Sequence, residues 1–399
     1  MFLGANKLRG DLDMQFRFND ELLLSEEDRS LAEKSFPNVY FALDHPELRA
    51  EFERIDGLAL TAKNRSRRIG CAALIFATLS LLTFPSEPLI KNIWQATIEH
   101  DIMFQYMAAA GATFGILALV FGNLGLGFGQ TKRNWLMKRL ITERLRQWHA
   151  QYIIAHSAQI ARVAHSEADK AEWLEQRALS FQRFKRNFID QIASEYTKFT
   201  HESAAAYSGQ SVGDPNAASS FWIEPAWAKS ADEKPSKDHQ KTLDEVYNAF
   251  HGTRMRGQIQ YTNYVLSADG KFWSSPAKQI HILGNLSYIL VVFAFVANFI
   301  ALVSALWSPF PISAAVLSSL AIAFAIFAVG VRAMLEGLRP QRETRRMQFY
   351  AAAINHADQS FGAARTHARK VAAMGMLERA SYDEMVEFIS SNEQARFVL

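Results

Sequence analysis

Four long apolar blocks interrupt an otherwise polar and charged chain. Residues 69–84, 102–128, 280–307 and 312–331 contain no Asp, Glu, Lys or Arg. A helix needs about 20 mostly apolar residues to cross a bilayer; the second and third blocks exceed this length, the fourth just reaches it, and the first is short and ends at Pro85. The pattern predicts an all-α integral membrane protein with two transmembrane helical hairpins, four spans in all, and long cytoplasmic helices. The alternative is a set of buried helices inside one large core.

Lysine and arginine gather on one side of both hairpins. They precede the first and third blocks and follow the second and fourth, whereas the connections inside the hairpins carry a single basic residue, Lys91. Positive residues mark the cytoplasmic side of a membrane, so we expect a multi-pass protein with both termini in the cytoplasm. No basic-then-apolar leader follows Met1, and we therefore expect no cleaved signal peptide.

These patterns divide the chain into seven segments. In order, we expect an N-terminal cytoplasmic segment (1–68), the first transmembrane hairpin (69–130), a cytoplasmic helical region (131–206), a linker (207–241), a cytoplasmic approach helix (242–279), the second transmembrane hairpin (280–335) and C-terminal cytoplasmic helices (336–399).

Helical periodicity continues between and after the hairpins. Aromatic residues, with Ile192 among them, recur every three or four positions from Phe181 to Phe199, which predicts one long helix that packs through this face. Pro340 predicts a helix break at Arg339, because proline disfavours helix in the residue before it, and a second break is expected around Ser381.

The linker contains Ser, Ala, Gly, Asp, Lys and Pro in high proportion, but also Trp222 and Trp227. Two tryptophans in such a segment dock either on the membrane interface or on the protein, and we favour docking on the protein.

Composition narrows the class of function. The 399 residues include 49% hydrophobic side chains, a net charge of +3 and a single cysteine, Cys71. One cysteine excludes a disulfide framework and the usual cysteine metal sites, and the net charge is too small to indicate nucleic-acid binding by itself. His149, His156 and His165 lack the i, i+4 spacing of a helical metal motif. We find no nucleophile or nucleotide-binding motif and expect no catalytic residue, no metal and no cofactor.

Small and polar residues inside the spans are candidates for helix packing or for lining a pore. Gly111 and Gly115 form a small-x-x-x-small pattern that lets helices approach closely in lipid. Asn123 and Asn298 are the most polar residues deep in the spans, and an amide in lipid must find a partner or water. With no carboxylate or base at the centre of a span, a proton-coupled transporter is disfavoured.

Arginines near the membrane are the candidate ligand-binding residues. A guanidinium binds two phosphate oxygens at once. Arginines that are three or four residues apart on a helix lie on the same face, so several of them can contact one ligand. The same arginines also satisfy the positive-inside rule and attract anionic lipid, which is the plainer interpretation. The candidate residues are Arg254, Arg256, Arg339, Arg342, Arg345 and Arg346.

Each hairpin is followed by the pattern R-x-x-x-E-x-L-R, at 139–146 and at 332–339, which indicates an internal duplication. A polar approach helix, a two-span hairpin and this basic helix together resemble the SLATT superfamily over about residues 45–165 and 245–360. The resemblance rests on Asp56, Ala62, Lys63, Arg68, Arg139, Glu143, Arg146 and Trp148 in the first half, and on Arg254, Gln258, Tyr261, Arg332, Glu336 and Arg339 in the second. This chain departs from the family pattern by carrying two hairpins, which leaves subunit number open.

The resemblance implies a bacterial inner-membrane effector of anti-phage defence that assembles as a homo-oligomer, for instance a tetramer, and forms an ion-conducting pore. It also implies a nucleotidyltransferase partner whose nucleotide or short DNA product controls the pore. The alternative is a membrane-anchored helical scaffold or sensor without channel activity.

Overall fold

The computed structural model describes residues 20–93, 100–197, 200, 221–230, 235–267, 272–273, 275–307 and 313–393. Across this described part the secondary structure is helical and contains no strand. The elements are η1 (Asp20–Leu22), α1 (Glu26–Ser35), α2 (Tyr40–Leu43), α3 (Pro46–Ile93), α4 (His100–Ala155), α5 (Ser157–Val163), α6 (Glu167–Phe184), η2 (Lys185–Ile189), α8 (Trp227–Ser230), η4 (Lys237–His239), α9 (Gln240–Phe250), η5 (His251–Met255), α10 (Arg256–Leu266), α11 (Pro276–Trp307), α12 (Ala314–Leu338), α13 (Pro340–Ala363) and α14 (His367–Glu393).

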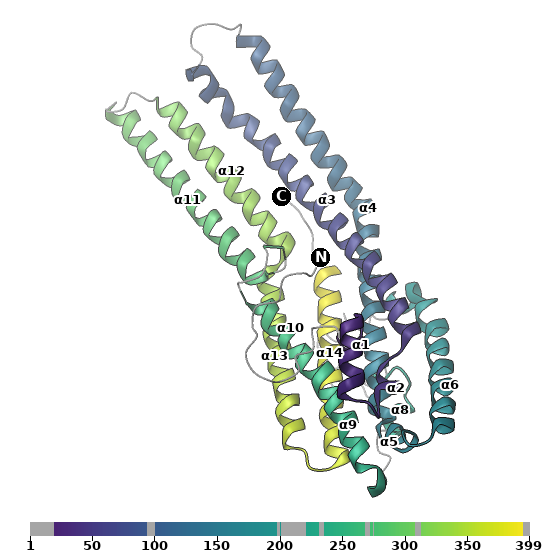
Figure 1. Ribbon diagram of the computed structural model, residues 1–399. Coiled ribbons are helices and arrows are strands. Elements are labelled where there is room, and N and C mark those ends of the chain that lie inside the picture. The colour runs from purple at the N-terminus through teal and green to yellow at the C-terminus, as the bar shows by residue number, and fades with distance from the viewer. Residues whose placement is uncertain are drawn as a thin grey trace.

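Two long helical hairpins lie side by side and project from a cluster of shorter helices (Figure 1). One hairpin is α3 with α4 and the other is α11 with α12, and α12 packs on α3. Four helices are long and apolar enough to cross a membrane, with mean hydropathy of 1.8, 1.4, 2.7 and 2.4 in their most apolar stretches. Phe295 and Trp307 on α11 are each 74% exposed, as expected for side chains that face lipid rather than water.

The first hairpin is far longer than a bilayer is thick. Helices of 48 and 56 residues extend about 72 and 84 Å at 1.5 Å per residue, against a hydrocarbon core of about 30 Å. The helix α3 also runs on through Pro85, beyond the end that the sequence suggested for the first span. Each helix is therefore one continuous rod that joins a span to the shorter helices.

The two hairpins touch where small residues allow it. A Cβ added to Gly330 of α12 would lie 2.6 Å from the Thr78 hydroxyl oxygen of α3, which is closer than any side chain can approach. Glycine at this position therefore lets the two hairpins pack directly on each other.

The shorter helices, together with the adjoining ends of α3 and α4, form what we call the helical domain. Its core surrounds Trp148 of α4, whose side chain is fully buried. The ring of Phe181 lies 5.2 Å from Trp148 and that of Trp227 lies 6.0 Å away. Residues from the linker and from α6 thus close the same core.

Several helix breaks differ from the predictions. The cytoplasmic helical region expected at 131–206 is interrupted at His156 and at 164–166, and the long helix expected from Phe181 to Phe199 is interrupted by the π-helical turn Lys185–Ile189 and by a turn at 190–191. The face of α6 that carries Phe181 packs on Trp148. The break expected around Ser381 is absent, since α14 is continuous there. The predicted break at Arg339 is confirmed: this residue adopts a left-handed conformation, with φ of 49°, between α12 and α13.

The linker tryptophans dock on the protein. Trp227 is buried, and Gln151 fixes the chain beside it. The Gln151 side chain donates from Nε2 to the carbonyl of Phe221 at 2.9 Å and accepts from the backbone N–H of Ile223 at 3.0 Å. This part of the linker belongs to the helical domain.

Candidate functional site

Charged side chains gather inside the helical domain, where apolar residues would be expected. Four arginines and five glutamates pair with one another over five separate elements, and we call them the charge network. Its members are Glu21 of η1, Arg139, Glu143 and Arg146 of α4, Arg254 of η5, Glu343 and Arg346 of α13, and Glu378 and Glu384 of α14.

The first part of the network lies along α4, just beyond the second span. Arg139 and Arg146 flank Glu143 one turn away on either side. Arg139 forms an ion pair with Glu143, and Arg146 reaches the same carboxylate from Nη1 at 3.1 Å. The spacing of four and three residues on a helix puts all three side chains on one face, and that face is turned into the domain.

Arg254 connects the second half of the chain to this face. It stands on the π-helical turn η5 between α9 and α10, and such turns often re-aim side chains at functional sites. Arg254 donates from Nε and Nη2 to the two carboxylate oxygens of Glu378, at 2.8 and 3.3 Å. This is the two-pronged geometry that makes arginine–carboxylate pairs strong.

A second cluster of contacts adjoins the first on α13 and α14. Arg346 forms ion pairs with Glu343 on its own helix and with Glu384 on α14. One turn further, the Tyr350 hydroxyl donates to Gln258 Oε1 at 3.0 Å and lies 2.8 Å from the Ser381 hydroxyl. These contacts tie α10, α13 and α14 together.

Mutual attraction offsets burial at some members of the network but not at all of them: at Glu378 and Glu384 burial outweighs the nearby arginines and raises the pKa of both carboxyls. Burial would raise the pKa of Glu143, but Arg139 and Arg146 outweigh it and hold that pKa below its usual range. Burial would lower the pKa of Arg254, but Glu378 and Glu21 outweigh it and raise that pKa. Such a network is costly to break, because any lost partner leaves a buried charge uncompensated.

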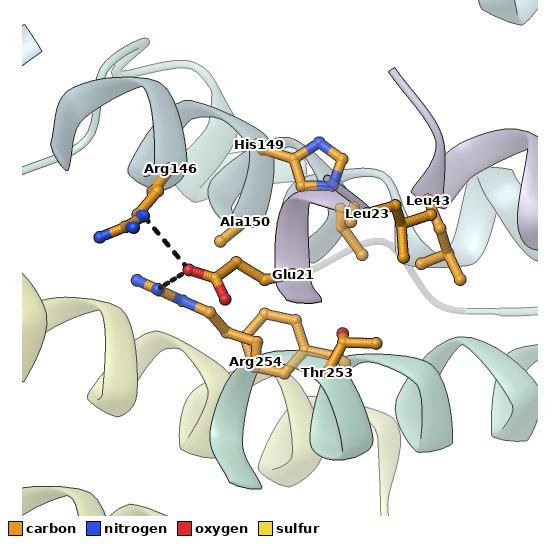
Figure 2. Close-up of a pocket in the computed structure, with 10 residues that line it drawn as sticks. Glu21, Leu23, Leu43, Arg146, His149, Ala150, Thr253 and Arg254 are labelled. Atoms are coloured by element: carbon orange, nitrogen blue, oxygen red, sulfur yellow. Dashed lines mark hydrogen bonds and ion pairs between the residues drawn. The ribbon is translucent and has the colours of Figure 1, made fainter. Parts of the chain in front are cut away.

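A small cavity lies at one edge of the network, beside Glu21, where the charged side chains of Glu21, Arg146 and Arg254 meet apolar residues. Figure 2 shows Glu21 pointing between Arg146 and Arg254, with His149 and Thr253 nearby. The Glu21 Oε1 atom lies 3.3 Å from Arg146 Nε and 3.4 Å from Arg254 Nη1. The cavity has a free volume of about 10 Å³, which is about what one water molecule needs.

The two copies of the motif that supply the network are separated by 200 residues, whereas the copies aligned from the sequence are separated by 193. The pattern R-x-x-x-E-x-x-R occurs at 139–146 and again at 339–346, 200 residues later. In both copies the glutamate and the following arginine form an ion pair inside the domain. By contrast, Arg332 and Glu336 of the 193-residue register are exposed, so the structure supports the 200-residue register. Searching for glutamate–arginine pairs at three-residue spacing could have found it.

The six candidate ligand-binding arginines are not brought to one surface. Arg254 and Arg346 are only 4% and 3% exposed and belong to the charge network. Arg339 donates from Nη1 to the carbonyl of Ser391 at 3.0 Å.

The other three, Arg256, Arg342 and Arg345, are exposed. The guanidinium of Arg345 lies 5.6 Å over the ring of Phe349. On α13 the helical turn thus divides the predicted arginine face, with Arg346 pointing inward and its neighbours outward. The sequence analysis missed the carboxylates that neutralise the buried pair.

The candidate packing residues of the spans fall in different surroundings. Gly111 and Gly115 face α3 of the same chain, where the Ser80 hydroxyl donates to the Gly111 carbonyl at 2.8 Å. This glycine face is therefore used within the hairpin and does not argue for contact between subunits. Asn298 is exposed on α11, and the side chain of Asn123 lies outside the described residues.

Within the described residues, no group of three or more His, Cys, Asp or Glu side chains is arranged to hold a metal ion. The ionic groups that the structure brings together here are arginines and carboxylates, and each of the four arginines is paired with at least one glutamate.

Comparisons with protein-family models, with characterised proteins and with solved structures gave no match, so the resemblance to the SLATT superfamily stays a prediction.

Proposed function

We propose that the protein is an oligomeric membrane effector in which the helical domain controls an ion-conducting pore. One observation carries the proposal: α4 runs without interruption from its apolar stretch to Ala155, and the charge network is built on its far end. A rigid helix transmits a shift or rotation of its end to the span. A ligand that rearranges the network would thereby move the span, as ligand-controlled channels require.

The orientation follows from charge. The helical domain lies at the end of the hairpins where Lys and Arg flank the apolar blocks, and basic residues favour the cytoplasmic side. We therefore place the domain and both termini in the cytoplasm and the hairpins in the inner membrane of a bacterium.

A pore in this proposal forms between copies of the chain. The hairpins of one chain pack closely through Gly330 and Thr78, which argues against a water path between them. Asn298 is exposed on the outside of α11, where lipid would offer its amide no partner. A second copy or a water-filled passage would supply one, so we propose a homo-oligomer, with a tetramer as one arrangement.

The resemblance to the SLATT superfamily supports a proposal for the signal that controls the pore. Proteins of the SLATT superfamily are associated with nucleotide-synthesising or nucleotide-sensing partners in anti-phage systems. We accordingly propose a nucleotidyltransferase partner and a nucleotide or short DNA product as the controlling signal, with cell death or arrest as the outcome.

A second candidate is a membrane-anchored scaffold or sensor without a pore. It is favoured by the span hydroxyls, which bond to carbonyls of the helices themselves. Thr78 donates to Leu74, Ser80 to Gly111 and Ser319 to Ala315. Hydroxyls engaged in this way have less capacity to replace the hydration shell of a passing ion.

Single-channel recording in planar bilayers separates the two candidates. The wild-type chain should conduct, and Asn298→Leu should change the conductance or the oligomer mass, because it removes the outward amide. The matched change Asn298→Gln keeps an amide and should have a smaller effect. A purified, correctly folded chain that never conducts, with or without added nucleotide, would favour the scaffold.

A further inference from the structure

Glu21 contacts the two guanidiniums around it through only one of its carboxylate oxygens. A single oxygen, Oε1, serves both Arg146 and Arg254 at 3.3 and 3.4 Å, while Oε2 is buried without a hydrogen-bond partner. Glu378 and Glu143 engage the other sides of these guanidiniums, and the donors that face Glu21, Arg146 Nε and Arg254 Nη1, suit an anion that offers a separate oxygen to each. The side chain of Glu21 is only 4% exposed, so its unpaired oxygen is shielded from bulk solvent and only a water molecule in the adjoining cavity would reach it.

Arg146 and Arg346 occupy the same position in the two copies of the motif, but their second carboxylate partners stand on different kinds of backbone. Arg346, the counterpart of Arg146, takes its second carboxylate from Glu384, which stands in the middle of the 27-residue helix α14. Arg146 takes its second carboxylate from Glu21, on a turn of three residues. One carboxylate is built into a long helix, and the other is carried by a three-residue turn that buried Leu22 and Leu23 anchor in the core.

The backbone beside Glu21 is strained. Leu23 has a φ of 49°, a left-handed conformation that costs a residue with a Cβ about 1 kcal/mol or more. The strained turn is held by Arg29 and Arg49, which both donate to the Leu23 carbonyl, at 3.3 and 3.4 Å. Release of η1 would relieve this strain.

The space available fits a larger anion. The cavity at Glu21 has about the volume of one water molecule. A carboxylate and a water molecule together fill roughly the space of one phosphate group. Departure of Glu21 would leave a phosphate-sized site between two guanidiniums, next to the His149 ring and the Thr253 side chain.

We infer that Arg146 and Arg254 form a binding site for a phosphate group, and that Glu21 occupies this site in the resting protein. The ligand is either free phosphate or the terminal phosphate of a nucleotide. Binding displaces η1, because both arginines are almost fully buried while Glu21 is in place.

The site spans the two halves of the chain, since Arg146 is on the helix of the first hairpin and Arg254 is on η5, within the approach to the second. A phosphate that holds both arginines would set the relative position of the two hairpins. This regulatory consequence rests on the proposed function, whereas the binding itself does not.

Calorimetric titration of the full-length chain in detergent tests the inference, with inorganic phosphate and AMP as probes. Glu21→Gln should bind one of them about tenfold more tightly than wild type, because the competing occupied state is removed. Glu21→Gln combined with Arg254→Gln should lose this gain. The control Glu53→Gln changes an exposed carboxylate on α3 and should bind as wild type does. Tighter binding of phosphate identifies the free anion as the ligand, and tighter binding of AMP identifies a nucleotide.

A second measurement uses the unmodified chain and does not depend on a variant that folds. Saturating probe should increase amide hydrogen exchange in residues 20–25, because η1 leaves its place. Equal affinity of the Glu21→Gln and Glu53→Gln variants, or no rise in exchange in wild type, overturns the inference. Binding with displacement but without any change in conductance would leave the site established and refute its control of the pore.

Discussion

Arg254 and Glu378 lie in direct two-pronged contact although the carboxylate of Glu378 is completely buried and 124 residues separate the two positions. The pair joins the turn before the second hairpin to the last helix of the chain. A buried ion pair of this kind contributes little compared with well-packed apolar residues, but the loss of one partner is severe. The main contribution of this ion pair is therefore to fix the position of α14 relative to η5.

A double-mutant cycle on the free energy of unfolding should show that Arg254 and Glu378 are directly coupled. Arg254→Gln should lower the free energy of unfolding of the helical domain by about 3–5 kcal/mol, because Glu378 is left buried without its cation. Adding Glu378→Gln should restore a large part of the loss. Denaturant titration followed by tryptophan fluorescence measures both. Asp383→Asn breaks the exposed pair with Arg379 and should cost at most about 1 kcal/mol. Additive losses in the two buried positions would contradict a direct coupling.

The contact between the hairpins should depend on Gly330. Gly330→Ala should weaken the packing of α12 on α3, because the new methyl group meets the Thr78 side chain at 2.6 Å. Thr78→Ala removes that obstacle and should restore stability in the double variant. Gly284→Ala on α11 has no atom within 4 Å of the new methyl group and serves as control. Thermal unfolding in detergent should show a lower midpoint for Gly330→Ala alone; equal midpoints for Gly330→Ala and Gly284→Ala would argue against this interface.

Lowering the pH should destabilise the helical domain through two buried histidines. Burial, and next the charge of Arg177, lower the pKa of His45 to about 2 and that of His149 to about 3. The unfolded chain binds protons with a pKa near 6.5, so it gains protons that the folded chain does not. The stabilisation is present above pH 6.5 and is lost as the pH falls below it, by about 1.4 kcal/mol per pH unit for each histidine.

Unfolding measured at pH 7, 6 and 5 tests this slope, and the comparison of variants cancels the opposite contribution of Glu378 and Glu384, whose pKa is raised by burial. His45→Asn keeps an acceptor near the Leu48 amide, which now contacts His45 Nδ1 at 3.4 Å, and it should make the slope about half as steep. The same substitution at exposed His356 should leave the slope as it is. An unchanged slope in His45→Asn would mean that this histidine protonates in the folded state.

The spans and the break at Arg339 could be predicted from the sequence because they depend on local chemistry. Uncharged apolar blocks define the spans, and Pro340 disfavours helix in the residue before it. The charge network could not be predicted, because helical spacing puts Arg342 and Arg346 on one side of α13 but does not say which arginine meets a carboxylate. Glu378 and Glu384, the partners from α14, lie outside every motif that the sequence analysis used. Long-range packing decides between a surface arginine and a buried one.

The orientation of the hairpins can be tested with single cysteines. Cys71 is the only cysteine, so a Cys71→Ala chain gives an unlabelled background. Leu179 on α6 of the helical domain is 60% exposed, and Trp307 at the far end of α11 is 74% exposed. Because basic residues flank the domain end of the hairpins, that end should stay in the cytoplasm. An impermeant maleimide should therefore label Trp307→Cys from outside intact cells, and Leu179→Cys should react only after the inner membrane is opened. Labelling of Leu179→Cys in intact cells would reverse the topology and place the charge network outside, where a cytoplasmic nucleotide could not reach it.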